Sequence, residues 1–421
     1  MENVSISAIK AREILDSRGR PMVEVDIWTH QGVMGRSASP CGTSVGKYEA
    51  SILRDGGKRL GGLGVQQAVK NVTEIIGPTL LGKSVFDQQA IDDLMIQLDG
   101  TPNKSRLGAN AIYGVSVAIA RVAANTLGLP LYRYLGREKA THIPMPVFNM
   151  INGGPYSNGV VEFQEFLLIP AAATTYAGAQ RMGVEIFYQI GPVLRRRYRQ
   201  KDIHFGHSAG YAAPVDDPAE VIEILLEAAE SAGYKGKVKI GLDCAASHFY
   251  DEKEGCYHFR GRKTSSTELI RFLEQLAQSY PLTFIEDPLQ EDDFKGFSEI
   301  TKRLSPILIV GDDLFVSQIE RLKQGVSLGA ANAMIFKPNM VGTLSEAMDT
   351  VRYAQEHHYW VIPSSRAGGS VDDPIPDLAI AVGARLAKFG APQSGERTTY
   401  QNHLLRTEEE LGSSATFDPL E

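Results

Sequence analysis

The sequence predicts an α/β protein in which a smaller α+β region precedes a βα barrel. With 421 residues, the chain is too long for one ordinary domain and long enough for a barrel with a smaller partner. In its second half, four short apolar runs each end in a charged residue: Asp243, Glu286, Asp312 and Lys337. The last two separations, 26 and 25 residues, each suit one strand, one helix and two loops. These repeated strand–helix units predict the barrel.

The first 140 residues read as strands followed by helices. Val23, Val25 and Ile27 alternate with acidic residues, which is the period of a half-buried strand. We expect strands over 4–14, 22–29 and 33–39, and helices over 65–81, 87–98 and 108–128. The last helix is apolar nearly all round, so we expect it to be buried. Prolines in the stretch 137–146 indicate a linker, and we place the two domains at 1–140 and 141–421.

Composition and charge argue against several classes of protein. The net charge of −7 argues against nucleic acid as the main partner. The three cysteines cannot all pair with one another, and no CxxC motif occurs, which fits a reducing compartment. No apolar run approaches the roughly 18 residues of a membrane helix, and the first residues do not read as a signal peptide. We therefore expect a cytoplasmic protein that binds neither nucleic acid nor membrane.

The charged residues at the predicted strand ends indicate metal-assisted chemistry. Parallel strands of a βα barrel present their carboxyl ends at one shared mouth. Three carboxylates converging there would form a site for a hard cation, and the lysine beside them would be a candidate base. A single acid after a strand is more often a helix cap or a solubilising loop residue. That interpretation fails for the whole set, because independent caps would not select the strand end every time.

Several longer strings carry a family resemblance. They are EILDSRGRP (13–21), LDGTPNKSRLGANA (98–111), NMINGG (149–154), QEF (164–166), DCAASHFY (243–250), IEDPL (285–289), GDDLFV (311–316) and LLRTEEELG (404–412). On these strings the chain resembles enolase (phosphopyruvate hydratase) along its whole length. The resemblance implies an N-terminal α+β capping domain and a modified (β/α)8 TIM barrel that is irregular in its first strand–helix units. It also implies Mg²⁺, a homodimer or a multiple of dimers, and interconversion of 2-phosphoglycerate and phosphoenolpyruvate.

The resemblance assigns metal and base roles to the strand-end residues. Asp243, Glu286 and Asp312 match the family's metal ligands, and Lys337 matches its base. Ser44, in the loop PCGTSVG, matches the residue that closes over a second metal ion. Divalent cations beside a lysine should lower its pKa, so we expect Lys337 to be neutral near physiological pH.

The resemblance also implies a set of substrate-binding residues. Lys388, in RLAKFG, matches the lysine that holds the substrate carboxylate. Arg366, in SSRAGG, matches the phosphate-binding arginine, and a guanidinium fork suits such an oxyanion. The remaining candidates occupy substrate-side positions of the family motifs: Gln164, Ser365, Tyr156 and Ser44.

Departures from the family motifs gather on the side of the substrate's hydroxyl and phosphate groups. The family's GDEGG-type loop, whose glutamate is a candidate acid, reads GHSAG here, with His207 and Ser208. A serine cannot act as that acid, because its pKa is far above neutrality. Glu165 is kept, so Glu165 and His207 are the candidate acids for the leaving hydroxyl, and the intrinsic pKa of a histidine suits the task.

Three further substitutions lie in the substrate-binding strings. The family's SHRSG-type loop reads SSRAG, so Ser365 replaces a histidine and Ala367 replaces a phosphate-binding serine. The NGGxH motif reads NGGPY, with Tyr156 in place of the histidine. In the string after the base, Met340 replaces a glutamine. The metal and base positions all match, so we interpret the pattern as retained proton abstraction with altered leaving-group or substrate chemistry.

Three functional interpretations follow. The first is an Mg²⁺-dependent lyase that takes the α-proton from a phosphorylated or phosphonylated three-carbon carboxylate, with weak ordinary enolase activity. Carboxyphosphonoenolpyruvate synthases of phosphonate biosynthesis are enolase homologues of this general kind. The second is a conventional enolase in which Glu165 or His207 supplies the acid. The third, an inactive scaffold, is disfavoured because a lysine buried beside three acids costs stability and gives a scaffold nothing.

Overall fold

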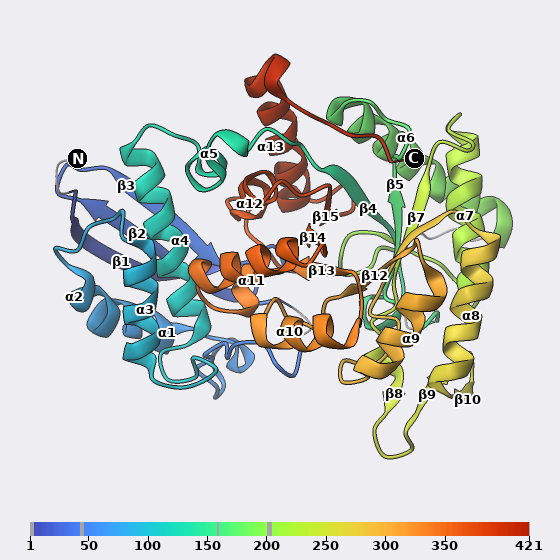
Figure 1. Cartoon of the computed structure of the whole chain (residues 1–421), viewed down its shortest axis with the longest axis horizontal. Helices are drawn as coiled ribbons and strands as arrows, with labels where there is room; N and C mark the ends of the chain where they lie inside the picture. The colour runs from blue at the N-terminus through green and yellow to red at the C-terminus, as the bar shows by residue number, and fades with distance from the viewer. Residues whose placement is uncertain (1–3, 43–45, 158–159, 200–203, 421) are drawn as a thin grey trace.

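Two parts make up the fold, a smaller α+β part at the left of Figure 1 and a larger barrel at the right. The computed structural model describes residues 4–42, 46–157, 160–199 and 204–420. In the smaller part, β1 (Ile6–Leu15), β2 (Pro21–Thr29) and β3 (Met34–Ser39) form an antiparallel sheet in the order β1-β2-β3. The helices that follow are α1 (Gln66–Asn71), α2 (Gly77–Leu80), α3 (Gln88–Asp99) and α4 (Ala109–Thr126), with a π-helical segment, Val72–Ile76, between α1 and α2.

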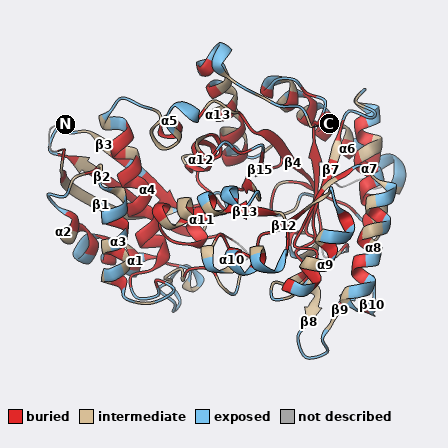
Figure 2. Cartoon of the chain, viewed as in Figure 1, coloured by how far each residue is buried: buried red, intermediate tan, exposed pale blue. Residues whose placement is uncertain are grey.

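Helix α4 covers one face of this sheet. The β2 side chains at alternate positions are fully buried, including Val25, and a Cβ on Gly114 of α4 would lie 3.0 Å from the Val25 side chain. A Cβ on Gly35 of β3 would come within 2.3 Å of the Val122 backbone nitrogen. Small residues thus let helix and sheet approach closely, and α4 is buried along nearly its whole length, as Figure 2 shows.

In the described ranges no single helix is long and apolar enough to cross a membrane. One bent pair, α4 with Leu131–Lys139, passes on length and composition alone.

Eight strands of the larger part line a barrel. They are β4 (Met145–Asn152), β5 (Glu165–Ile169), β7 (Lys239–Asp243), β11 (Leu282–Glu286), β12 (Leu308–Gly311), β13 (Ala333–Phe336), β14 (Trp360–Pro363) and β15 (Leu386–Gly390). The hydrogen-bonded order is β14-β13-β12-β11-β7-β5-β4-β15, and β6 (Tyr211–Ala212) pairs with β4. Ser364, directly after β14, bridges to Lys388 of β15, which brings the two ends of the sheet together. The predicted α/β fold class is confirmed.

Strand β5 runs against both of its neighbours, whereas the strands from β7 to β14 are parallel. An antiparallel strand begins where its neighbours end. Glu165, the first residue of β5, therefore pairs with Asp243, the last residue of β7, and reaches the same mouth. This reversal is the irregularity in the first barrel units that the family resemblance implies.

Helices surround the barrel strands on the outside. They are α6 (Tyr176–Tyr198), α7 (Pro218–Ser231), α8 (Ser266–Ser279), α9 (Phe294–Leu304), α10 (Ile319–Leu328), α11 (Leu344–Glu356), α12 (Ile375–Ala381) and α13 (Gly395–Leu411). Side-chain caps fix where several of them begin. The Asp217 carboxylate accepts a hydrogen bond from the Ala219 N–H at 3.0 Å, and Ser265 and Glu268 form a capping box on α8. Strands β4, β5 and β15 are buried at every position, because side chains cover both of their faces.

The smaller part is joined to the barrel by polar contacts near the mouth. The Asp92 carboxylate of α3 accepts hydrogen bonds from the Ser345 hydroxyl at 2.6 Å and the Ser345 N–H at 3.0 Å, at the start of α11. The Arg20 guanidinium donates to the carbonyl oxygens of Gly42 at 2.9 Å and Ala367 at 3.1 Å. The small part therefore contacts the loop after β14 directly.

Candidate active site

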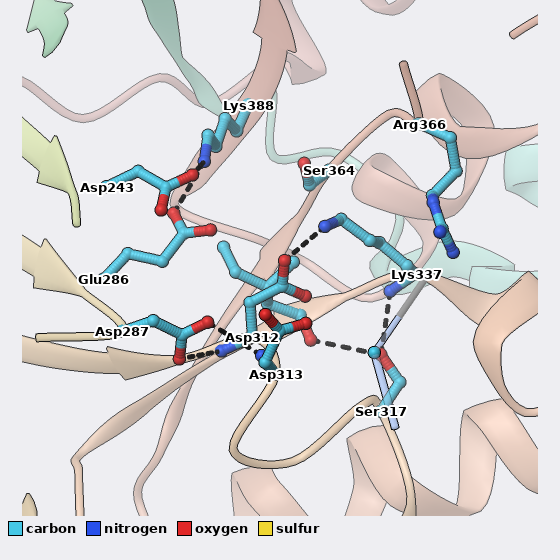
Figure 3. Close-up of polar contacts among 12 residues, drawn as sticks. Asp243, Glu286, Asp287, Asp312, Asp313, Ser317, Lys337, Ser364, Arg366 and Lys388 are labelled. Atoms are coloured by element: carbon cyan, nitrogen blue, oxygen red, sulfur yellow. Dashed lines mark hydrogen bonds and ion pairs between the residues drawn. The ribbon is translucent and has the colours of Figure 1, made fainter. Parts of the chain in front are cut away.

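The four strand-end residues identified by their spacing lie together at the barrel mouth (Figure 3). Asp243 and Glu286 end β7 and β11, and Asp312 and Lys337 directly follow β12 and β13. Lys388 of β15 joins them, because the bridge between β14 and β15 closes the sheet at this point. Barrel topology thus brings together side chains that are up to 145 positions apart in the chain.

The Lys388 ammonium contacts three carboxylates. Its Nζ lies 2.7 Å from Glu286 Oε2, 2.8 Å from Asp243 Oδ2 and 3.0 Å from Glu165 Oε2. Burial raises the pKa of both Asp243 and Glu286, and repulsion from neighbouring carboxylates adds to the effect. One ammonium among three buried carboxylates leaves an excess of negative charge.

Lys337 pairs with Asp312 through a short contact between Nζ and Oδ2. Burial acts to lower the pKa of Lys337, but the Asp312 and Glu286 carboxylates outweigh burial, so the pKa is raised. The lowered pKa that we expected for Lys337 depended on divalent cations beside it. The protein's own carboxylates raise this pKa instead. The other Asp312 oxygen, Oδ1, is buried and accepts no hydrogen bond from any described residue. A buried carboxylate oxygen without a donor is costly and is available to a cation.

Asp287 is an acid of the mouth that the strand-end analysis missed. Its carboxylate accepts hydrogen bonds from the backbone N–H groups of Asp312 at 3.0 Å and Asp313 at 2.8 Å, and so fixes the turn after β12. Carboxylate oxygens of Asp287, Asp312 and Asp313 lie within 4.8 Å of one another. The adjacent acids in IEDPL and GDDLFV were a signal for this second group.

The predicted ligand set fits Mg²⁺ on two observations of this structure. The excess of buried carboxylates around Lys388 and the unbonded Asp312 Oδ1 both favour a bound cation. Oxygen donors are those that Mg²⁺ prefers. Asp243, Glu286 and Asp312 are therefore the residues that would hold the ion, while Asp287 is occupied by backbone donors.

A cavity opens beside this cluster. Its lining residues are Tyr156, Gln164, Glu165, Ser208, Asp243, Lys337, Ser364, Ser365, Arg366, Ala367, Lys388, Gly390 and Arg397. The structure thus places six of the predicted substrate-side and acid residues on one cavity wall: Lys388, Arg366, Gln164, Ser365, Tyr156 and Glu165. Gln164 Nε2 donates to Asp243 Oδ2 at 3.1 Å, which links this wall to the carboxylate cluster.

The two candidate acids occupy different positions. Glu165 lines the cavity and hydrogen-bonds the Ser208 hydroxyl. His207 is exposed and is not among the lining residues; its ring packs on that of Tyr156, with centroids 5.6 Å apart. Partial burial, together with Arg18 and Arg20, lowers the pKa of His207. Only Glu165 of the pair is therefore placed to reach a molecule in the cavity.

Arg366 is held from the smaller part of the molecule. Its Nη1 lies 2.9 Å from Glu49 Oε2 and its Nη2 lies 3.2 Å from Glu49 Oε1, and both side chains are buried. Ser44, the candidate for covering a second metal ion, lies outside the described residues. Arg397 also lines the cavity, and the sequence analysis missed it. The available signal was a charged residue in the first turn of the helix that follows β15.

Comparisons with known proteins cover nearly the whole chain. The family model "Enolase, N-terminal domain" matches residues 6–135, and "Enolase, C-terminal TIM barrel domain" matches residues 140–420. The chain is 48% identical over 417 residues to a protein named Enolase from Methanopyrus kandleri, covering 98% of each chain. It is 45% identical to the Enolase of Methanothrix thermoacetophila and 46% identical to that of Thermococcus gammatolerans, covering 99% of this chain and 98% of each relative. Together with the barrel and its mouth, these matches show that the chain belongs to the enolase family of lyases.

Proposed function

We propose that this protein interconverts 2-phosphoglycerate and phosphoenolpyruvate in an Mg²⁺-dependent reaction that begins with removal of the α-proton. The observation that carries this proposal is the placement of Lys337 and Lys388 on one cavity wall with Arg366. Two ammonium groups and a guanidinium suit a small molecule with both a carboxylate and a phosphoryl group. The full-length similarity to proteins named Enolase supports the same reaction.

Each residue has a proposed task in this reaction. Lys388 holds the substrate carboxylate, and Arg366 holds the phosphoryl group. Lys337 removes the proton from the carbon next to the carboxylate, where acidity is low. Mg²⁺ held by Asp243, Glu286 and Asp312 would supply positive charge that offsets the negative charge developing on the carboxylate. Burial acts to raise the pKa of Glu165, but its ionic partners, Lys388 foremost, outweigh burial and lower it. Glu165 must therefore take up a proton before it gives one to the departing hydroxyl group, which leaves as water.

A second candidate reaction is favoured by the rebuilt wall of the cavity. Ser208, Ser365 and Ala367 all line it, at positions where the family motifs carry an acid, a histidine and a serine. Such a wall suits a phosphonyl group or a different leaving group on the same carboxylate scaffold. In that case proton abstraction is retained, and dehydration of 2-phosphoglycerate is slow.

Two measurements on one substrate test the proposal and separate the candidates. Incubation with 2-phosphoglycerate and Mg²⁺ in D₂O, followed by NMR, reports exchange of the C2 proton, and ultraviolet absorbance reports phosphoenolpyruvate. Exchange together with fast turnover supports the conventional reaction, and exchange with little turnover supports the specialised one. Lys337→Ala should abolish exchange. Exchange that persists in this variant, or is absent from the wild type, would overturn the assignment of the base.

A further inference from the structure

Arg397 is a buried cation in the cavity wall, and the described residues hydrogen-bond only part of its guanidinium. It lies in the first turn of α13 and is 3% exposed. The nearest carboxylate oxygen, Glu396 Oε1, is 3.5 Å from its Nε, and that Nε makes no hydrogen bond to any described residue. Burying a guanidinium without full hydrogen bonding is costly. A group of this kind in a cavity wall is suited to an anion that enters the cavity.

The Arg397 guanidinium fixes the side chain of Ser365. Its Nη1 donates to Ser365 Oγ at 2.9 Å. The Ser365 backbone N–H donates to the Lys388 carbonyl at 3.0 Å, so the residue is held from two directions. Because Ser365 Oγ accepts from Arg397, its own proton is directed elsewhere, and no hydrogen bond donated by this hydroxyl is found among the described residues. Both residues line the cavity.

A glycine makes room for the guanidinium. A Cβ on Gly390, at the end of β15, would lie 2.4 Å from Arg397 Nη1, and the glycine φ is +80°. A side chain at position 390 would therefore displace the arginine from the wall. The position of Arg397 depends on backbone geometry and on the Ser365 contact.

Arg397 and Arg366 give this wall two guanidinium groups. Arg397 Nη2 lies 3.5 Å from the Arg366 carbonyl oxygen. Among the described residues, the Glu49 carboxylate pairs with the Arg366 guanidinium and not with that of Arg397. Ala367, the next residue along the chain from Arg366, also lines the cavity, and its methyl group cannot donate a hydrogen bond. Two cations and one oriented hydroxyl suit a doubly charged tetrahedral ligand better than they suit a carboxylate ligand.

From this geometry we infer that Ser365 and Arg397 complete a subsite for a phosphoryl or phosphonyl group. Ser365 donates to an oxygen of that group, and Arg397 is the positioning residue that orients Ser365 and adds positive charge. The inference rests on the proposed function for the identity of the substrate. It goes beyond that proposal by naming two residues that take over anion binding where Ala367 offers no hydroxyl.

Binding of simple anions tests the subsite without requiring turnover. We would measure the affinity of the wild type for inorganic phosphate and for methylphosphonate by calorimetry in excess Mg²⁺. The variants are Ser365→Ala, Arg397→Lys, Arg397→Gln and the double variant Ser365→Ala/Arg397→Gln. Arg54→Gln is a matched control, since among the described residues Arg54 donates only to the backbone carbonyls of Pro21 and Leu63, and it is not part of the cavity lining.

The expected result is a loss of affinity of about 10- to 100-fold for Arg397→Gln, the range for a hydrogen bond to a charged group. Ser365→Ala should lose less, Arg397→Lys should recover part of the affinity, and the double variant should bind no more weakly than Arg397→Gln. With 2-phosphoglycerate as substrate, these variants should raise KM more than they lower kcat. Equal affinity for phosphate and methylphosphonate would assign a subsite for either group, and a preference would identify the natural one.

Contrary outcomes fall into distinguishable classes. If Arg397→Gln and Ser365→Ala bind the anions as tightly as the wild type does, the assignment of the subsite is wrong and Arg397 has a structural role. Failure of the wild type to bind either anion would also overturn it. If Arg397→Gln does not fold, Ser365→Ala and Arg397→Lys decide. If the wild type shows no C2 exchange but its anion binding depends on Arg397, the proposed function fails and the subsite stands.

Discussion

The two sides of the cavity are built from different parts of the fold. On one side, Asp243, Lys337 and Lys388 lie on the barrel strands or directly after them and form buried ion pairs. On the other, Ser208 and Ser365 extend from loops and make single hydrogen bonds. Removing one partner of a buried ion pair costs about 3–5 kcal/mol, whereas a loop hydroxyl contributes roughly 1 kcal/mol. The comparison indicates that the residues proposed for proton abstraction also stabilise the barrel, while those proposed to recognise the leaving group and the anion can change independently.

The largest effect is expected on the strand-end side. Asp312→Asn removes one negative charge from the proposed metal site and should lower activity by about a thousandfold, which corresponds to several kcal/mol of lost stabilisation. Asp313→Asn, the neighbouring acid, should keep most of the activity. Chelation of Mg²⁺ by EDTA should mimic the first variant, and activity should return on adding Mg²⁺. An equal loss in both variants would instead assign the metal to Asp287, Asp312 and Asp313.

A smaller effect is expected where the two sides meet. Glu165→Gln removes the proposed acid and should lower phosphoenolpyruvate formation by about 10²–10⁴-fold, the usual contribution of general acid catalysis. Exchange of the C2 proton should survive, because Lys337 is intact. His207→Ala should change turnover only a few-fold, since its ring lies on Tyr156 outside the cavity lining. The reverse ranking would make His207 the acid.

Restoring the family's residues on the loop side gives a third prediction. If 2-phosphoglycerate is a poor substrate, His207→Asp, Ser208→Glu and Ser365→His together should raise its turnover, by about tenfold or more. Ser208→Glu alone should not help, because it adds a carboxylate beside Glu165 and Asp243. Steady-state absorbance assays check both variants. A wild-type rate like that of ordinary enolases would remove the basis for this experiment and for the specialised interpretation.

The last prediction concerns stability, not activity, near the loop side. Asp373, beyond the loop after β14, is a buried carboxylate whose pKa is raised to about 6, mainly by burial. The folded state therefore favours its protonated form, and this stabilisation is lost as pH rises from about 4 through 6. Asp373→Asn keeps an acceptor for the Ile375 N–H. It should stabilise the protein by about 2–3 kcal/mol at most near pH 8, and by nothing near pH 4.

Denaturant unfolding at the two pH values checks this prediction. A matched measurement on Asp217→Asn, a half-buried helix cap of α7 that also pairs with Arg260, controls for loss of a charge at a helix start. A gain that does not depend on pH would show that ionisation of Asp373 is not the cause.

The sequence predicted the strand-end side of the site well. The apolar runs and their spacing located Asp243, Glu286, Asp312 and Lys337, because a parallel strand must end at the mouth. The buried α4 also followed from a local pattern. The direction of β5 did not, because an apolar run is the same in either direction. The placement of Glu165 opposite Asp243 therefore needed the fold.

The loop side was predictable only in part. Ser365 and Arg366 were found through the family motif, but the contact of Ser365 with Arg397 joins residues 32 positions apart. Local sequence carries no signal for such a pair. His207 and Ser208 are neighbours in one motif, yet only Ser208 lines the cavity. In a loop, backbone torsions rather than a regular period decide which of two adjacent side chains faces the substrate.

The pairing of Glu49 with Arg366 has a consequence for how this protein can be divided. Glu49 belongs to the smaller part, and Arg366 belongs to the barrel, 317 positions later in the chain. An excised barrel would keep every strand yet carry a buried guanidinium with no counter-charge from Glu49, and Arg20 would no longer brace the loop after β14. A truncated or transplanted barrel should therefore be a poor catalyst and a poor folding unit. We therefore expect the two parts to be exchanged between proteins only together.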